Sequence, residues 1–240
     1  MTLLEICLDD IGGAAIAEHC GADRIELCAD LAQGGTTPSL GTVSAVLASI
    51  TSVGAHILVR QRPGDFVYRG IEVDAMVRDI EAIGALTRPA GVTVGFVVGA
   101  LTADGQVDLA VMTLLLRACG SAPVTFHRAF DAVTDQSESL EVIIDLGIDR
   151  VLTSGGQATA LAGIGNLADL VDQADNRLSI LAAGSIRPDN VAEIVRKTGV
   201  SEVHLRAQST ADGNPGSTPP TTSAEVVRAV SSALASPRSI

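Results

Sequence analysis

LLEICL at residues 3–8 and DRIELC at residues 23–28 are two short apolar stretches that each contain a glutamate and a cysteine two positions apart. Because side chains alternate across a strand, Glu5 and Cys7 share one face, and the second stretch repeats the arrangement. If the two strands lie side by side in parallel, two carboxyl groups and two thiols meet at one end of a sheet. The pattern therefore predicts neighbouring parallel strands and a site at their ends.

Apolar runs rich in β-branched residues recur along the chain, and helical patterns separate them. Strands are predicted at residues 3–8, 23–28, 56–60, 93–98, 124–128, 150–153, 179–183 and 202–205. Helices are predicted at residues 12–20, 41–50, 73–86, 109–118, 137–146, 166–174, 190–197 and 224–235. Glycine closely follows four of these helices, as is typical of a helix C-cap: Gly21, Gly120, Gly147 and Gly199.

Eight strand–helix units in 240 residues favour a closed (β/α)₈ TIM-type barrel, whose usual length is about 250 residues. The alternative is an open doubly wound sheet, but no G-x-G-x-x-G motif follows the first strand. We expect one domain over residues 1–240. The segment 211–222, rich in Gly, Pro, Ser and Thr, predicts a mobile loop before the last helix.

Composition limits the function classes. The chain is 47% hydrophobic but only 2% aromatic, so the core must consist of aliphatic side chains. Its net charge of −12 disfavours nucleic acids and anionic membranes as partners, although a local basic pocket for a small anion remains compatible with it. No predicted helix stands out as a contact between two copies of the chain. The sequence therefore leaves open whether the protein forms a homo-oligomer.

The four cysteines are widely spaced, which favours reduced thiols over a disulfide framework. The first strand is predicted to start at Leu3, so we expect no signal peptide. No apolar run approaches the length of a membrane span. A cytoplasmic protein is the prediction.

In a barrel of this kind, the carboxyl ends of the strands form the functional face. Polar residues gather there in pairs spaced two positions apart on a strand, so that both members of a pair can point into the lumen. The candidate set comprises Glu5, Cys7, Glu26, Cys28, Arg60, Arg62, His127, Asp131, Ser154, Gly155, Gly156, Gly184, Ser185, His204 and Arg206. We expect no comparable cluster at the opposite ends of the strands. Structural Glu–Arg pairing explains some such residues, but the whole set favours a site.

Three kinds of chemistry fit this set. Cys7 and Cys28 can share a soft ion, and Cu(I) accepts two thiolates; the alternative is that both are small buried apolar residues. The glycine-containing loops that follow two late strands can bind an anion, assisted by Arg60, Arg62 and Arg206. These loops contain Ser154, Gly155, Gly156, Gly184 and Ser185, and glycines also serve tight turns without a ligand.

Acid–base catalysis is the third possibility. A small polyhydroxylated or carbonyl substrate can exchange protons with Glu5, Glu26, His127, Asp131 and His204. The one lysine, Lys197, is predicted to lie on a helix rather than at a strand end, which disfavours a Schiff-base aldolase mechanism.

Several segments in order resemble the copper homeostasis protein CutC family. They begin with RIELC at residues 24–28, GGTTPS at 34–39 and RQRPGDFVY at 60–68. They continue with GALTADG at 99–105, VTFHRAFD at 124–131, LTSGG at 152–156 and EVH at 202–204. The chain departs from the family pattern at Gln61, in the 183–185 loop and at 206–208.

The resemblance implies a TIM-type barrel, a cytoplasmic location and a role in copper binding or tolerance, with Cys7 and Cys28 at the positions of the suggested copper ligands. Two hypotheses follow. One is a copper homeostasis protein that binds Cu(I) through these cysteines. The other is an isomerase or lyase acting on a small anionic, sugar-like metabolite, and the sequence leaves the enzyme question open.

Overall fold

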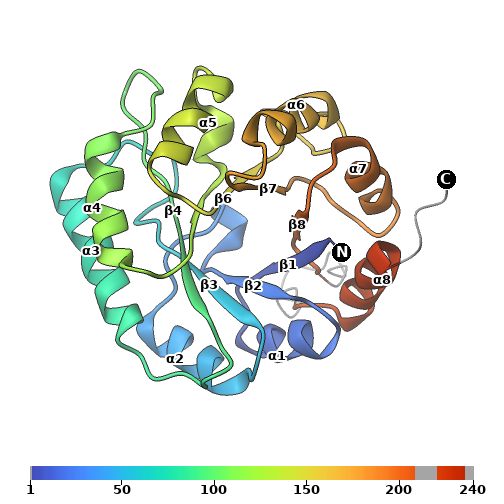
Figure 1. Cartoon of the computed structure of the whole chain (residues 1–240). Coiled ribbons are helices and arrows are strands. Elements are labelled where there is room, and N and C mark those ends of the chain that lie inside the picture. Colours follow the sequence, from blue (N-terminus) through green and yellow to red (C-terminus); the bar gives the residue numbers. More distant parts are fainter. Residues whose placement is uncertain (1, 209–220, 236–240) are drawn as a thin grey trace.

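The computed structural model describes residues 2–208 and 221–235, and its eight strands close into a parallel barrel in chain order. Helices alternate with the strands and surround them (Figure 1). The barrel closes because β8 pairs with β1, with Glu5 opposite His204. The predicted TIM-type barrel is confirmed, and the open doubly wound sheet is excluded.

The strands start and end close to the predicted positions. They are β1 Leu3–Leu8, β2 Arg24–Leu27, β3 Gly54–Leu58, β4 Val94–Val98, β5 Val124–Phe126, β6 Arg150–Thr153, β7 Ser179–Ala182 and β8 Glu202–Leu205. The prediction extended β5 to Arg128, which is wrong. His127 instead accepts a hydrogen bond from the N–H of Ala129 and begins the short 3₁₀ helix Arg128–Ala132.

The helices also follow the prediction, with small shifts at their starts and ends. They are α1 Ile11–His19, α2 Leu40–Ser49, α3 Gly70–Gly84, α4 Leu109–Cys119, α5 Gln136–Asp145, α6 Ile164–Ala174, α7 Val191–Thr198 and α8 Ala224–Ala235. Helix α3 begins three residues before its predicted start because Glu72 accepts the backbone N–H of Arg69 at 2.8 Å and caps the first turn. A second 3₁₀ turn, Leu31–Gln33, follows β2.

The predicted glycine caps are confirmed. Gly147 and Gly199 follow α5 and α7 with φ angles of 73° and 74°, a left-handed conformation that favours glycine. Most of the predicted mobile loop at 211–222 lies outside the described residues. Of this loop, the structure describes Thr221 and Thr222. The single-domain organisation stays a prediction.

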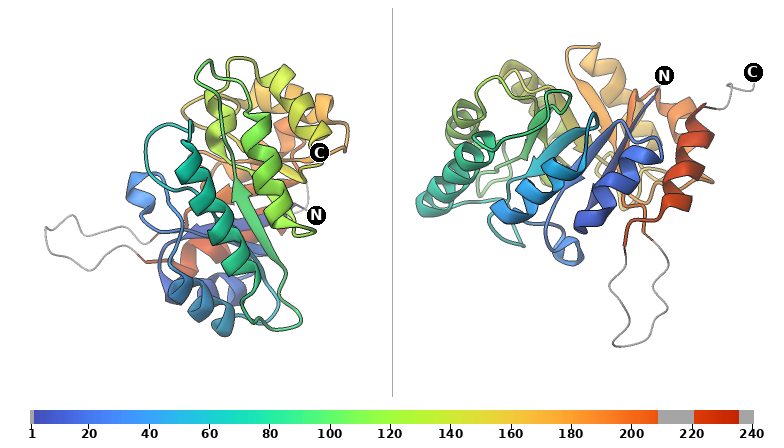
Figure 2. Two further views of the ribbon diagram at one scale, coloured as in Figure 1. Left: turned by 90° about the vertical axis from the view of Figure 1, so that its left-hand side faces the viewer. Right: turned by 90° about the horizontal axis from the view of Figure 1, so that it is seen from below.

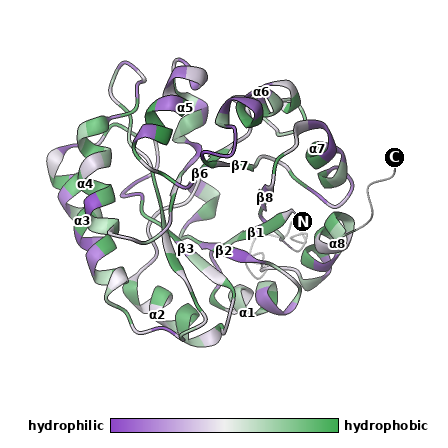
Figure 3. Cartoon of the chain, in the orientation of Figure 1, coloured by the Kyte–Doolittle hydropathy of each residue, from purple (hydrophilic) through white to green (hydrophobic). Residues whose placement is uncertain are grey.

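Most of the core lies between the barrel and its helices, where aliphatic side chains such as Ile57, Met76 and Leu167 are fully buried. Side views show these helices on the outside of the barrel, with α3 beside α4 (Figure 2). Inside the barrel two small apolar clusters, one around Leu58 and one around Leu181, interrupt a polar lumen. Strands β2 and β8 alternate charged or polar residues with apolar ones, and both carry hydrophilic positions (Figure 3).

Charged residues occupy the amino-terminal ends of three strands, so the expectation that this end lacks a cluster is wrong. Arg24 of β2 forms ion pairs with Glu5 and Glu202, the second at 2.5 Å, and Arg150 of β6 lies 3.3 Å from Glu202. Arg24, Glu5 and Glu202 are buried. This ionic network, Glu5–Arg24–Glu202–Arg150, lies within the barrel beneath the mouth.

Among the described residues, none of the helices has the length and apolar character needed to cross a bilayer. The longest of them, α3, has 15 residues, whereas a membrane span takes about 20.

Candidate metal centre at the barrel mouth

A pocket of about 170 Å³ opens at the carboxyl ends of the strands. Six residues predicted for the site line it: Cys7, Glu26, Cys28, Arg60, His127 and His204. The remaining lining residues are mostly apolar and include Leu31, Leu58, Phe66 and Leu152, with Gly34 and Arg128 beside them. The structure therefore brings both candidate cysteines, two histidines and one carboxyl group into one cavity, which we call the mouth pocket.

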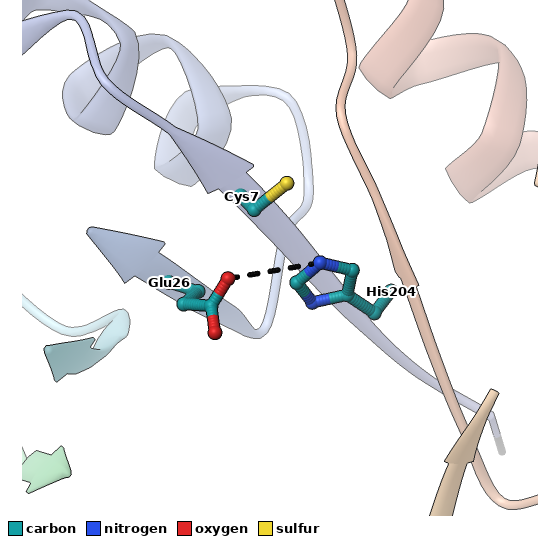
Figure 4. A group of neighbouring side chains, drawn as sticks. All are labelled: Cys7, Glu26 and His204. Atoms are coloured by element: carbon teal, nitrogen blue, oxygen red, sulfur yellow. Dashed lines mark ion pairs between the residues drawn. The ribbon is translucent and has the colours of Figure 1, made fainter. Parts of the chain in front are cut away.

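Three donor atoms form a compact group within the mouth pocket. One atom each from Cys7, Glu26 and His204 lie within 4.8 Å of one another, and all three residues are buried. They come from β1, β2 and β8, and Figure 4 shows Glu26 and His204 facing each other with Cys7 beside them. The Nε2 atom of His204 lies 3.7 Å from Oε2 of Glu26. A thiol, an imidazole and a carboxyl group at this spacing can converge on one metal ion.

Glu5 orients the imidazole of this group from below. Its Oε1 atom lies 2.7 Å from Nδ1 of His204, and its other oxygen pairs with Arg24. A carboxylate that accepts the Nδ1–H of a histidine fixes the ring and leaves Nε2 free to bind a metal. Glu5 was predicted to act at the mouth, and the structure places it in the buried ionic network instead.

Cys28 lies beside the trio. Its thiol donates a hydrogen bond to Oε2 of Glu26 at 3.5 Å. Cys28 is 1% exposed and Cys7 is 7% exposed, yet both line the same cavity. The shared cavity is the arrangement that a two-thiol copper site requires.

Neighbouring charges separate the pKa values of the two buried glutamates. Burial acts to raise the pKa of Glu5, but Arg24 and His204 outweigh it and hold this pKa well below its usual range. Burial also raises the pKa of Glu26, and here it prevails. It raises the pKa of the Cys28 thiol well above its ordinary value, with Glu26 adding to the effect. Burial would lower the pKa of His204, but Cys7, Glu26 and Glu5 raise it well above 6.5.

His127 forms another wall of the mouth pocket. Its Nδ1 accepts the N–H of Ala129 at 3.1 Å, and its Nε2 is buried with no hydrogen-bond partner. Phe66 packs on the imidazole with the ring centroids 5.0 Å apart. Burial lowers the pKa of His127 to about 3, with a further contribution from the charge of Arg60, so the ring is neutral near pH 7.

Arg60 supports the loops around the pocket. Its guanidinium donates to the carbonyl oxygens of Gly34, Gly35 and Gly64 at 2.8–3.2 Å. It also lies over the ring of Phe66 at 5.0 Å. Arg62, by contrast, pairs with Asp65 and Glu72 and does not line the mouth pocket.

The predicted anion loop after β6 is engaged by a side chain of the protein itself. The carboxylate of Asp131 accepts the N–H groups of Ser154 and Gly156, both at 3.1 Å, and the hydroxyl of Thr153 at 2.5 Å. The N–H of Gly155 donates to Thr153 at 2.9 Å. The backbone donors that would bind an external anion therefore already have partners, and Asp131 contacts this loop rather than the mouth pocket.

The other predicted loop residues also lie outside the pocket lining. Gly184 packs closely on the β6 loop, where an added Cβ would meet Ser154 at 3.0 Å. Ser185 follows it with a φ angle of 56°. Arg206 donates to Asp9 at 2.9 Å. Sequence reasoning identified these residues by position but not their partners.

Sequence reasoning missed the apolar half of the pocket and one glycine that makes room for it. A Cβ on Gly99 would lie 2.6 Å from the ring of His127. Phe66, Leu58 and Leu152 line the pocket without any polar signature. The phase of Leu58 with Arg60 and of Leu152 with Ser154 was the available signal, because residues two apart share a face.

The CutC family model matches residues 2–209. A family protein CutC of Mesorhizobium japonicum is 46% identical over 207 residues, which is 86% of this chain and 78% of that protein. The copper homeostasis protein cutC homolog of Homo sapiens is 41% identical over 210 residues, covering 88% of this chain and 75% of the human protein.

A solved structure supports the same relationship. The crystal structure of the putative copper homeostasis protein CutC from Streptococcus agalactiae superposes with a TM-score of 0.79 at 31% identity. The match covers 85% of this chain and 98% of the Streptococcus agalactiae chain. The model match, the relatives and the shared barrel agree, and the chain belongs to the CutC family.

Proposed function

We propose that the chain is a copper homeostasis protein that binds Cu(I) as cargo at the mouth of its barrel. The observation that carries the proposal is the convergence of donor atoms from Cys7, His204 and Glu26 within 4.8 Å, with Cys28 lining the same pocket. Thiols and imidazoles are the soft and intermediate ligands that Cu(I) prefers. The copper homeostasis names of the relatives support the same assignment.

The donor set defines the roles. Cys7 and His204 are the primary ligands, because the trio contains these two softer donors and Glu5 fixes the imidazole. Cys28 provides the second thiol from the adjacent strand. Glu26 hydrogen-bonds that thiol and is the hardest donor of the group, so we assign it a supporting role.

A reducing compartment suits this site. All four cysteines are free and buried, and Cu(I) binding requires thiols that are not paired in disulfides. We therefore propose a cytoplasmic location as well.

Anaerobic Cu(I) titration against a chromogenic chelator tests the proposal. We expect one tightly bound Cu(I) in the wild type, and a loss of affinity of more than about a hundredfold in the Cys7→Ser, Cys28→Ser double variant, since two of its soft ligands are gone. Cys20→Ala and Cys119→Ala are matched controls, because these thiols lie outside the pocket lining. Equal stoichiometry and affinity in the double variant and the wild type would refute the assignment.

The alternative function, an isomerase or lyase for a small anionic metabolite, stays a prediction. Its proposed anion loop after β6 is engaged by Asp131, so any anion subsite must lie elsewhere in the mouth.

A further inference from the structure

One wall of the mouth pocket lacks the metal donors. It consists of His127, Arg60 and apolar side chains. We infer that this wall binds the carboxylate of a small organic acid, with one oxygen accepting the Nε2–H of His127 beside the positive charge of Arg60. The inference goes beyond copper binding and does not depend on it.

The first support is an unpaired buried donor. Because Nδ1 of His127 accepts the N–H of Ala129, the neutral ring carries its hydrogen on Nε2. His127 is 4% exposed, it lines the pocket, and no described residue accepts from its Nε2. Buried donors are rarely left without a partner, so an acceptor from a ligand is the missing element.

The second support is a buried cation without a counter-ion. Arg60 is 7% exposed, and its terminal nitrogens donate to three neutral carbonyl groups of the loops. Within residues 2–208 and 221–235, no carboxylate forms an ion pair with it, and its Nε has no hydrogen-bond partner. A buried charge is costly unless it is paired, which favours an anionic ligand.

The remaining lining defines the rest of the ligand. Leu58, Leu152 and Phe66 present apolar surface, so the acid carries a short hydrocarbon part. The pocket of about 170 Å³ is smaller than the roughly 300 Å³ at the lower end of drug-sized sites. The acid therefore has only a few carbon atoms.

Isothermal titration calorimetry tests the inference. The protein is kept metal-free with a chelator, propionate is the probe, and propionamide is its neutral isostere. We expect saturable binding of propionate and at least about tenfold weaker binding of the amide, because the amide lacks the charge that Arg60 attracts. Absence of saturable propionate binding, or equal affinity for the two probes, would overturn the inference.

Two further measurements test whether His127 contacts the bound acid. His127→Asn keeps an acceptor for Ala129 but removes the Nε2–H, and we expect about tenfold weaker propionate binding. His19→Asn is the matched control, since His19 is exposed at the end of α1. In the wild type, the Nε2 resonance of His127 must shift on saturation, which tests the contact without a variant. An unshifted resonance, or a folded His127→Asn protein with unchanged affinity, contradicts the assignment.

Failure here is distinguishable from failure of the copper proposal. The Cys7→Ser, Cys28→Ser variant should lose Cu(I) affinity and keep propionate binding. His127→Asn should show the opposite pattern. Loss of both ligands in either variant would mean that the two walls do not bind independently.

Discussion

Gly99 directly follows β4 and has no side chain where the chain passes the imidazole of His127. A Cβ there would lie 2.6 Å from two ring atoms. Such a contact forces either the ring or the backbone to move. The mouth pocket therefore depends on a residue that contributes no atom to it.

The Gly99→Ala variant should lose about 1–3 kcal/mol of unfolding free energy, because the added methyl group overpacks the lumen. Urea denaturation measures the effect. Gly12→Ala is the control, since a Cβ on Gly12 of helix α1 meets no atom within 4 Å and should stabilise the helix slightly. Introducing Gly99→Ala into a His127→Ala background should remove most of the cost. A cost of the same size in both backgrounds would show that the ring is not the obstacle.

At the scale of elements, a single glutamate on α1 holds the loop that leads into β3. The carboxylate of Glu18 accepts the N–H groups of residues 51–53 at 2.7–3.1 Å. Burial acts to raise the pKa of Glu18, but these hydrogen bonds lower it from 4.5 to about 2. Its contribution to stability is thus complete above pH 4.5 and is lost as the pH falls toward 2.

The Glu18→Gln variant should therefore be less stable than the wild type by about 1 kcal/mol near pH 7, a value reduced by the partial exposure of the carboxylate. The difference should shrink as the pH falls from 4.5 toward 2. Urea unfolding at pH 7 and pH 3 measures it, with Glu81→Gln, an exposed glutamate in α3, as the control. A difference that stays constant over this range would show that the charge of Glu18 is not responsible.

Elements were the most predictable level of this structure. Periodicity and glycine caps located all eight strands and helices, because each unit repeats the same local signals. The predicted boundaries were wrong where a side chain accepts a backbone N–H group at the end of an element. His127 does so after β5, and Glu72 does so at the start of α3. For the site, phase alone placed six residues in one pocket. The partners of Asp131 and Arg60 were not predictable, since they depend on how the loops fold back.

At the scale of the whole molecule, the buried ionic network joins strands that are distant in sequence. Arg24 bridges Glu5 and Glu202, which belong to β1 and β8. In-phase charges at the starts of β2, β6 and β8 were the available signal for this network. The sequence-based prediction missed this network, because it placed the functional polar residues only at the carboxyl ends of the strands.

The Arg24→Met variant should lose about 3–5 kcal/mol of stability, because it removes the cation that bridges two buried carboxylates. Equilibrium unfolding in urea measures the loss. Arg177→Met is the control: Arg177 and Glu141 form an exposed pair with side chains 43% and 44% accessible, and its loss should cost at most about 1 kcal/mol. Similar losses in the two variants would contradict the importance of the buried network.

The pairing of the last strand with the first also has a consequence for biosynthesis. Cys7 and Glu26 leave the ribosome early, but His204 reaches them only when β8 closes the ring beside β1. A nascent chain that ends before residue 204 thus lacks the imidazole, however well its earlier units have folded. The complete three-donor centre arises only after nearly the whole polypeptide has been translated, so metal loading would belong to the finished protein.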